Sequence, residues 1–429
     1  MSRMPLTTRG RRGAGYGSSL ALALALAVAA FAGSAALSAP AFAQAPAAAA
    51  QPEYKPSRGF SRLYQPISVI ANDAAGDAAA GRAQLPALLA AVENADDRYL
   101  AGNLHYSLGL KLNDLALQRR GMELMLESGK AAPAAVAEMN YFLGEWAYDA
   151  QQWAQARQYL QAARAAGYAE GNVEGLTAES YFKEGQVAQG LTYLEGVIQQ
   201  QRQAGRQPPE AWLRRAQAVA VEARDFALAG KWSATLAAEY PTQENWRRAL
   251  TVAEQMSLDA KAYVDVLRLM TLTNSLNDRE RFALYIDAID PRIMATEAGR
   301  VLAAARAAGV LTESDPDYAQ VKAIVDQRAP GEAAEAANYA TEAASAAHGR
   351  PAENAGDLYL ALQDFAKAEE MFQLALTKGG VDRDAILTRL GMAQAQQAKY
   401  AEAKATFAQV SGARLPVAQL WTAYVDSKA

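Results

Sequence analysis

The feature that most constrains this 429-residue chain is an internal repeat with a period of about 35 residues. Near the C-terminus, Phe365-Ala-Lys-Ala368 recurs 35 positions later as Tyr400-Ala-Glu-Ala403, and each copy is preceded by a glycine and followed by a phenylalanine at the same spacing. Periods of this length are typical of folds in which each repeat is one supersecondary unit. Because such a unit cannot bury an apolar face alone, neighbouring units have to stack.

Weaker copies of the pattern occur upstream. They comprise Leu108-Gly109, Leu143-Gly144, Trp153-Ala-Gln-Ala156, Gly190, Phe226-Ala-Leu-Ala229, Tyr240-Pro241, Trp246 and Ala262. We predict that each unit is a pair of antiparallel helices, with a small residue late in the first helix (helix A) and an alanine early in the second (helix B). Helix axes that cross at roughly 8–10 Å leave room only for small side chains at the crossing. At least seven units are legible, over about two-thirds of the chain.

This spacing resembles the tetratricopeptide repeat. The matching signature positions are Gly356, Tyr359, Ala368, Phe372 and Ala375 in one unit, Gly391, Ala403 and Phe407 in the next, and the helix-terminating Pro241. The match is looser in the middle, where Ala178 and Gln217 stand at the glycine position and Ser233 at the aromatic one. The resemblance implies an all-α, right-handed superhelical solenoid of antiparallel helix pairs, with the A helices lining a concave groove that binds a partner.

Helices are predicted in the less regular part as well. Asp278 and Pro291 indicate starts for helices over 279–289 and 292–308, and Asp315-Pro316 indicates one for a helix over 318–327. Residues 332–347 favour a helix with only a thin apolar stripe. We expect this helix to be the least well packed stretch and to join an N-terminal block to a C-terminal block. We therefore predict an N-terminal solenoid over 61–330 and a C-terminal repeat block over 331–429. Residues 44–60, rich in Ala, Pro and Gln, are predicted to be a disordered linker.

The first 43 residues have the pattern of a secretory signal peptide. Four arginines precede an apolar core over Leu20–Ala32, and Ala41-Phe42-Ala43 has the spacing that signal peptidase reads. We predict cleavage between Ala43 and Gln44. An uncleaved anchor is the alternative, but the apolar core of about 13 residues is short of the ~20 that span a membrane. A twin-arginine signal fits less well, because Gly13-Ala14 follows the arginine pair.

Composition narrows the compartment and the partners. The chain has no cysteine, which excludes disulfides, thiolate nucleophiles, zinc–sulfur sites and a lipidated cysteine. With the Ala-rich leader, this favours a bacterial periplasm. Removal of the four leader arginines changes the formal net charge from −4 to −8. Such a surface repels nucleic acid and anionic lipid, so neither is an expected partner.

The sequence offers little for catalysis. There are two histidines: His105 lies where a packing aromatic is expected, and His348 is predicted at a helix C-terminus. No H-E-x-x-H, G-x-S-x-G or P-loop motif occurs, and acidic pairs such as Glu369-Glu370 are typical of solvated helix faces. We therefore expect no enzyme activity, no cofactor and no metal site, and an enzyme with an unrecognised site is the least favoured hypothesis.

Two features suggest a binding surface. The pairs Arg214-Arg215 and Arg247-Arg248 fall at the same place in successive A helices and would form a positive patch suited to a carboxylate. The alternative is a solvated helix face, because Glu210 and Glu244 stand four residues before Arg214 and Arg248, the favoured order for an ion pair within a helix.

The second feature is an aromatic run. Tyr141 and Tyr148 share one helix face, while Phe142 and Trp146 share another. One set is expected to pack between helices and the other, Tyr141 with Tyr148, to line the groove, although aromatic stripes are more often core.

Our leading hypothesis is a non-catalytic periplasmic scaffold that holds a segment of another envelope protein in its concave groove. The alternative is an accessory factor in envelope polysaccharide or peptidoglycan assembly. The sequence does not identify the partner or the oligomeric state.

Overall fold

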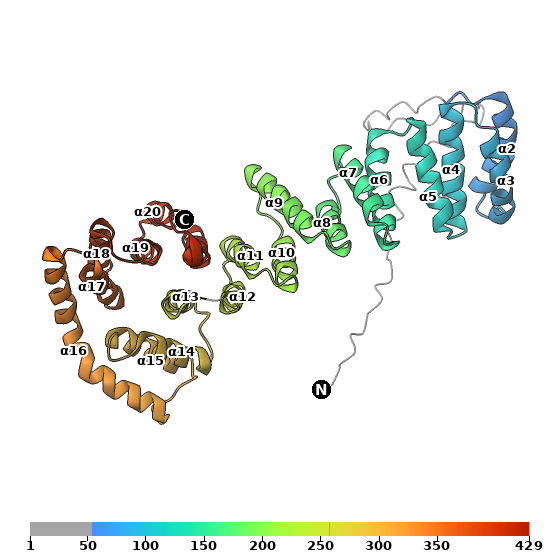
Figure 1. Cartoon of the computed structure of the whole chain (residues 1–429). Helices are drawn as coiled ribbons and strands as arrows, with labels where there is room; N and C mark the ends of the chain where they lie inside the picture. The colour runs from blue at the N-terminus through green and yellow to red at the C-terminus, as the bar shows by residue number, and fades with distance from the viewer. Residues whose placement is uncertain (1–53, 257, 429) are drawn as a thin grey trace, which may run out of the picture. The chain divides into compact units, whose positions relative to one another are not determined.

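The computed structural model describes residues 54–256 and 258–428, and every regular element within these ranges is helical. The chain divides into two compact units between Gln186 and Val187, and each is described by itself (Figure 1). The predicted signal peptide lies outside the described residues. The predicted linker ends earlier than residue 60, because α2 begins at Arg58 with the Ser57 hydroxyl accepting from the Phe60 amide.

Unit 1 is a stack of consecutive helices. They are α2 (Arg58–Asn72), α3 (Ala78–Ala90), α4 (Ala95–Lys111), α5 (Leu115–Ser128), α6 (Pro133–Asp149), α7 (Trp153–Ala165) and α8 (Val173–Lys183). Helices α4 and α5 are in close contact at Gly102 and Gly121. A Cβ on Gly121 would lie 2.5 Å from the Tyr106 amide nitrogen, and one on Gly102 would lie 2.7 Å from the Gly121 carbonyl oxygen. Small residues therefore set the crossing of this pair.

Unit 2 continues the same arrangement with more helices. They are α9 (Val187–Gln203), α10 (Glu210–Glu222), α11 (Phe226–Glu239), α12 (Gln243–Glu254), α13 (Ala260–Leu272), α14 (Arg279–Ile289), α15 (Ala295–Ala307), α16 (Pro316–Ser345), α17 (Arg350–Ala361), α18 (Phe365–Lys378), α19 (Arg383–Gln396), α20 (Tyr400–Phe407) and α21 (Leu415–Asp426). One apolar core runs through the unit from Ala234 to Val425.

The predicted repeat geometry is confirmed. The aromatic residues that open the tetrapeptides, Trp153, Phe226, Phe365 and Tyr400, are each the first residue of a B helix. A Cβ on Gly356 would lie 2.6 Å from the Phe372 ring, and one on Gly391 would lie 2.4 Å from the Phe407 ring. The small residue of helix A and the aromatic residue of helix B therefore fill one crossing. The fold is all-α and tetratricopeptide-like.

Two predicted helix boundaries differ from the structure. The helix expected from Arg292 begins at Ala295, because Asp290 (φ 49°) forms a turn and its carboxylate accepts from the Arg292 amide. The separate helices expected over 318–327 and 332–347 are one helix, α16, which runs through Pro330. Ala336 and Ala343 are fully buried, but most other residues of this stretch are exposed or half-buried, which agrees with the predicted thin apolar stripe. The boundary predicted at 330/331 falls inside α16.

Unit 2 closes on itself through its last helix. α21 packs against α20 and α19, as a next repeat would, and also against α11, α12 and α13 (Figure 1). Trp421 of α21 is 1% exposed, and its Nε1 donates to the Asp265 carbonyl oxygen at 2.9 Å. The C-terminal helix thus covers a face of α13 that an open solenoid would leave to solvent.

Candidate partner-binding surfaces and a buried charge network

The structure brings the two predicted arginine pairs together on neighbouring helices of unit 2. Arg214 on α10 forms ion pairs with Glu210 at 2.9 Å and with Glu244 of α12 at 3.5 Å. Asn245 Nδ2 also donates to Glu210 at 2.9 Å, which ties the helices at this point. We call the four arginines, Arg214, Arg215, Arg247 and Arg248, the arginine strip.

The arginine strip is interleaved with acidic side chains. The pairs Glu210–Arg214 and Glu244–Arg248, at 2.9 and 2.8 Å, are the ion pairs within a helix that the alternative predicted. Hydrogen bonds from Asn245 and Arg214 lower the pKa of Glu210. A hydrogen bond from Arg248 likewise lowers the pKa of Glu244. Arg215 pairs with Glu222 at 3.4 Å, whereas Arg247 is exposed. Because these pairs face solvent, they stabilise little and can exchange partners.

The predicted aromatic residues lie in unit 1 and take part in packing. Tyr141 is 8% exposed, stacks on Tyr168 with ring centroids 4.5 Å apart and donates to Glu145 at 2.7 Å. Burial raises its pKa. Tyr148 is half-buried, with its ring edge-on to Trp153 at 5.1 Å. Tyr141 is therefore part of the packed interior, while Tyr148 keeps some exposed surface.

A buried charge network in unit 2 was not predicted from the sequence. Asp265 on α13 is fully buried and lies at its centre. Its carboxylate is 2.8 Å from Arg268 Nη1, 2.7 Å from Arg414 Nη1 and 3.4 Å from Arg389 Nε. One carboxylate thus joins α13 to α19 and to the short helical turn before α21.

The network continues from Arg268 and Arg389. Arg268 donates from Nε and Nη2 to the two oxygens of Glu297, both at 2.8 Å, and the Tyr285 hydroxyl donates to the same carboxylate at 2.8 Å. Burial alone would favour the neutral form of Glu297, but Arg268 outweighs it and lowers the pKa of this carboxyl. Arg389 donates to Asp357 at 2.8 Å, yet burial still raises the pKa of Asp357.

One sequence signal could have revealed this network. Helix α13 reads Tyr263-Val-Asp-Val-Leu-Arg-Leu-Met270, so Asp265 and Arg268 sit three residues apart in an otherwise apolar helix. A helix that is apolar all round is buried all round, and charges inside it have to be paired. Their partners on α15, α19 and beyond were not deducible, because Arg389 and Arg414 read as ordinary surface charges.

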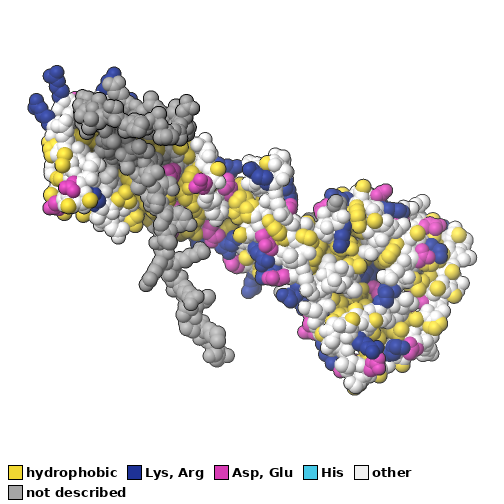
Figure 2. All heavy atoms as spheres, turned by 180° about the vertical axis from the view of Figure 1, so that it is seen from behind, with side chains coloured by type: hydrophobic (Ala, Val, Ile, Leu, Met, Phe, Trp, Pro, Cys, Tyr) yellow, Lys and Arg dark blue, Asp and Glu magenta, His cyan; other side chains and the backbone are white. Residues whose placement is uncertain are grey.

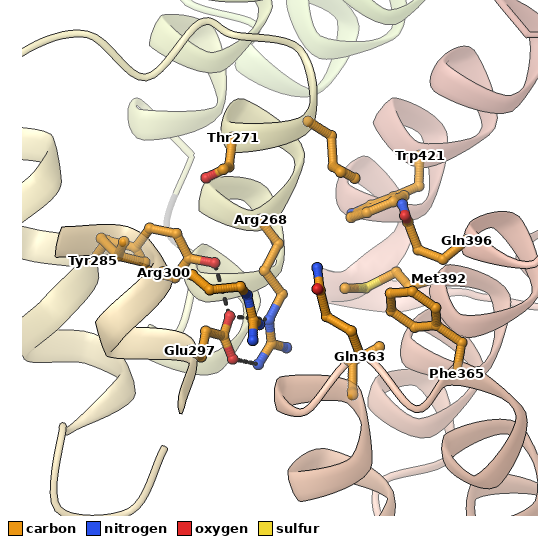
Figure 3. A pocket seen from close by; sticks show the side chains of 13 residues that line it. Arg268, Thr271, Tyr285, Glu297, Arg300, Gln363, Phe365, Met392, Gln396 and Trp421 are labelled. Atoms are coloured by element: carbon orange, nitrogen blue, oxygen red, sulfur yellow. Dashed lines mark hydrogen bonds and ion pairs between the residues drawn. The ribbon is translucent and has the colours of Figure 1, made fainter. Parts of the chain in front are cut away.

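Beside this network unit 2 contains a cavity of about 90 Å³ (Figure 3). Arg268, Tyr285, Glu297 and Arg300 line one side of it, and side chains from α17 to α21 line the other.

On the outside of the unit, Figure 2 shows hydrophobic side chains gathered over its middle, with charged side chains of both signs around them. Within residues 54–256 and 258–428, no group of three or more His, Asp or Glu residues is arranged to hold a metal ion.

Comparison with known proteins gives matches of low sequence identity to solved helical structures. No family model and no curated protein matches the chain. A Naa15/Naa10 structure bound to HypK-THB is 13% identical, with a TM-score of 0.38, and the match covers 83% of this chain and 64% of that one. The TPR2AB domain of yeast Sti1 in its pHSP90 complex is 17% identical with a TM-score of 0.22, covering 68% of this chain and 98% of that one. A tetratricopeptide repeat protein from Parabacteroides merdae is 12% identical with a TM-score of 0.24. The match covers 67% of this chain and 99% of that one.

At these identities the likeness concerns helical architecture alone. The paired helices, the glycine–aromatic crossings and the repeat period define a tetratricopeptide-like helical-repeat protein.

Proposed function

We propose that the chain is a non-catalytic periplasmic scaffold that binds another envelope protein through the surface formed by its A helices. Stacked helical repeats present extended surfaces of this kind. The observation that carries the proposal is the arginine strip, in which repeat spacing and tertiary packing place four guanidinium groups on adjacent helices, α10 and α12.

The chemistry of the arginine strip suits an acidic, extended segment of a partner. A guanidinium group donates two parallel hydrogen bonds to a carboxylate, which gives orientation as well as attraction. Glu244 is exposed, so a partner carboxylate can replace it at little cost, whereas Glu210 is half-buried and also accepts from Asn245. Arg247 and Arg248, which are exposed, offer first points of contact.

The test is capture of partners from an envelope extract with wild-type protein and with the double variant Arg214→Glu and Arg248→Glu. Loss of a protein partner in the variant, with its helix content and melting unchanged, is the expected result. Arg292→Glu with Arg306→Glu is the matched control, because both arginines are exposed and paired with acids within unit 2. Identical partners in all three samples would refute a role for the arginine strip. Retention of glycan rather than protein would favour the alternative role in polysaccharide or peptidoglycan assembly.

The periplasmic location is proposed from the leader sequence, which lies outside the described residues. The intact mass of the exported protein tests it, and a mature chain that begins at Gln44 is expected. A start elsewhere, or a chain that keeps its leader, would contradict the assignment. None of the helices in residues 54–256 and 258–428 is both long and apolar enough to span a bilayer.

A further inference from the structure

The cavity beside the charge network has an uncompensated positive charge. Its charged lining residues are Arg268, Glu297 and Arg300. The Glu297 carboxylate already accepts three hydrogen bonds, two from Arg268 and one from Tyr285. No hydrogen bond or ion pair joins the Arg300 guanidinium to any residue in the described part of the chain.

Arg300 is also withdrawn from water. Its side chain is only partly exposed, and burial lowers its pKa, although Glu297, Tyr285 and Glu332 act in the opposite direction without contacting it. A guanidinium that is desolvated without a partner is unfavourable, and an anion placed beside it would remove that cost. Two arginines and one carboxylate line the cavity, so its lining carries one more positive than negative charge, and Glu332, which does not line it, makes no contact with Arg300.

The opposite wall supplies further donors and an apolar surface. Gln363, Phe365, Met392, Gln396 and Trp421 face Arg268 and Arg300 across the cavity (Figure 3). The Gln396 Nε2 atom is buried and has no hydrogen-bond partner of good geometry, although the Tyr424 hydroxyl is near. Trp421 and Met392 are each 1% exposed, so their contact surface toward the cavity is rigid and apolar.

We propose that this cavity binds a small organic acid, with the carboxylate held by Arg300 and Gln396 and an apolar group lying against Trp421 and Phe365. The volume of about 90 Å³ can enclose the carboxylate and part of the apolar group of such an acid. Thr271, Leu272 and Gln363 are lining residues that are also exposed, so the cavity is reached from solvent on their side. This site lies on different helices from the arginine strip and does not depend on the proposed scaffold function.

The experiment is calorimetric titration of the full exported chain with phenylacetate and hexanoate, each up to about 10 mM. Phenylacetamide serves as the neutral isostere. Both acids are expected to bind, and the amide at least about tenfold more weakly, because the hydrogen bonds to a charged group are lost. In Arg300→Met the affinity for phenylacetate is expected to fall at least about tenfold. Arg306→Met is the matched control on the same helix, since Arg306 lies outside the cavity and pairs with Glu313.

Location is tested by fluorescence. Phenylacetate is expected to change the tryptophan emission of the wild type, and this change is expected to disappear in Trp421→Phe. If Arg300→Met does not fold, Gln396→Leu replaces it. This variant is also expected to lose the preference for phenylacetate over phenylacetamide. Equal binding of acid and amide, unchanged affinity in the variant, or no binding by either acid would overturn the proposal. A short peptide ending in phenylalanine that binds while both free acids do not would also overturn it, because the ligand would then be a chain terminus.

Discussion

Replacing Gly391 with alanine is expected to destabilise unit 2, whereas Gly331→Ala is expected to stabilise it. Both glycines lie inside helices of the same unit, α19 and α16. Alanine is favoured over glycine in a helix interior by roughly 0.5–1 kcal/mol. A Cβ on Gly331 meets no atom within 4 Å, so the whole of this gain should appear in the free energy of unfolding.

At Gly391 the packing term opposes the helix term and is larger. The added Cβ would lie 2.4 Å from Phe407 Cε1 and 2.7 Å from Cδ1, where ordinary contacts begin at 3.4 Å. The ring would have to move by about 1 Å, yet Phe407 is 2% exposed and has little free space. Overpacking of this kind costs about 1–3 kcal/mol. The net destabilisation is therefore expected to be up to about 2.5 kcal/mol.

Chemical denaturation followed by circular dichroism measures both changes, and thermal melts provide a check. In a unit of this size 1 kcal/mol corresponds to about 2–4 °C, so the melting temperature should fall for Gly391→Ala and rise for Gly331→Ala. Phe407→Leu adds a third test, because the smaller side chain relieves the clash. The double variant Gly391→Ala with Phe407→Leu should be less destabilised than the sum of the single variants. Stabilisation by Gly391→Ala, or strict additivity with Phe407→Leu, would refute the reasoning.

Three further predictions follow from the closed core and from unit 1. Asp265→Ala should destabilise unit 2 by about 3–5 kcal/mol in urea denaturation, because it leaves three buried arginines without a shared carboxylate. The control, Asp326→Ala on the surface, should lower the free energy of unfolding by less than about 0.5 kcal/mol. Trp421→Ala should cost about 3–5 kcal/mol and increase hydrogen exchange in α11 and α13, and unchanged exchange there would contradict closure by α21. Burial lowers the pKa of His105 below 6.5, so the unfolded chain takes up a proton first as the pH falls. The stability of unit 1 should therefore be full above pH 6.5 and decline below it by at most about 1.4 kcal/mol per pH unit, with a shallower decline in His105→Gln.

Local features of the fold could be predicted because their causes are local. The start of α14 at Arg279 follows from Asp278, whose carboxylate accepts from the Arg281 amide within the first turn. The crossings at Gly356 and Gly391 follow from the need for a small residue where two helices meet. The helices predicted separately over 318–327 and 332–347 are joined through Pro330, because packing of α16 against α15 and α17 keeps the helix continuous.

The candidate sites divide in the same way. The arginine strip was accessible to sequence reasoning because repeat spacing places Arg214 and Arg247 at equivalent positions. Its pairing with Glu210 and Glu244 also follows from spacing along single helices. Tyr141 was expected at a groove surface, but its ring is covered by Tyr168, a neighbour beyond the next helix that periodicity does not reveal.

The sequence alone thus determined the helical-repeat architecture, since a 35-residue period and small residues at the crossings depend only on neighbours along the chain. Tertiary structure alone decided how unit 2 ends. Asp265 meets Arg414 across 149 positions, and its carbonyl oxygen meets Trp421 across 156. No periodicity links residues so far apart, because their meeting depends on the summed rotation of the intervening repeats. That closure buries the charges around Asp265 and leaves the cavity in which Arg300 has no partner.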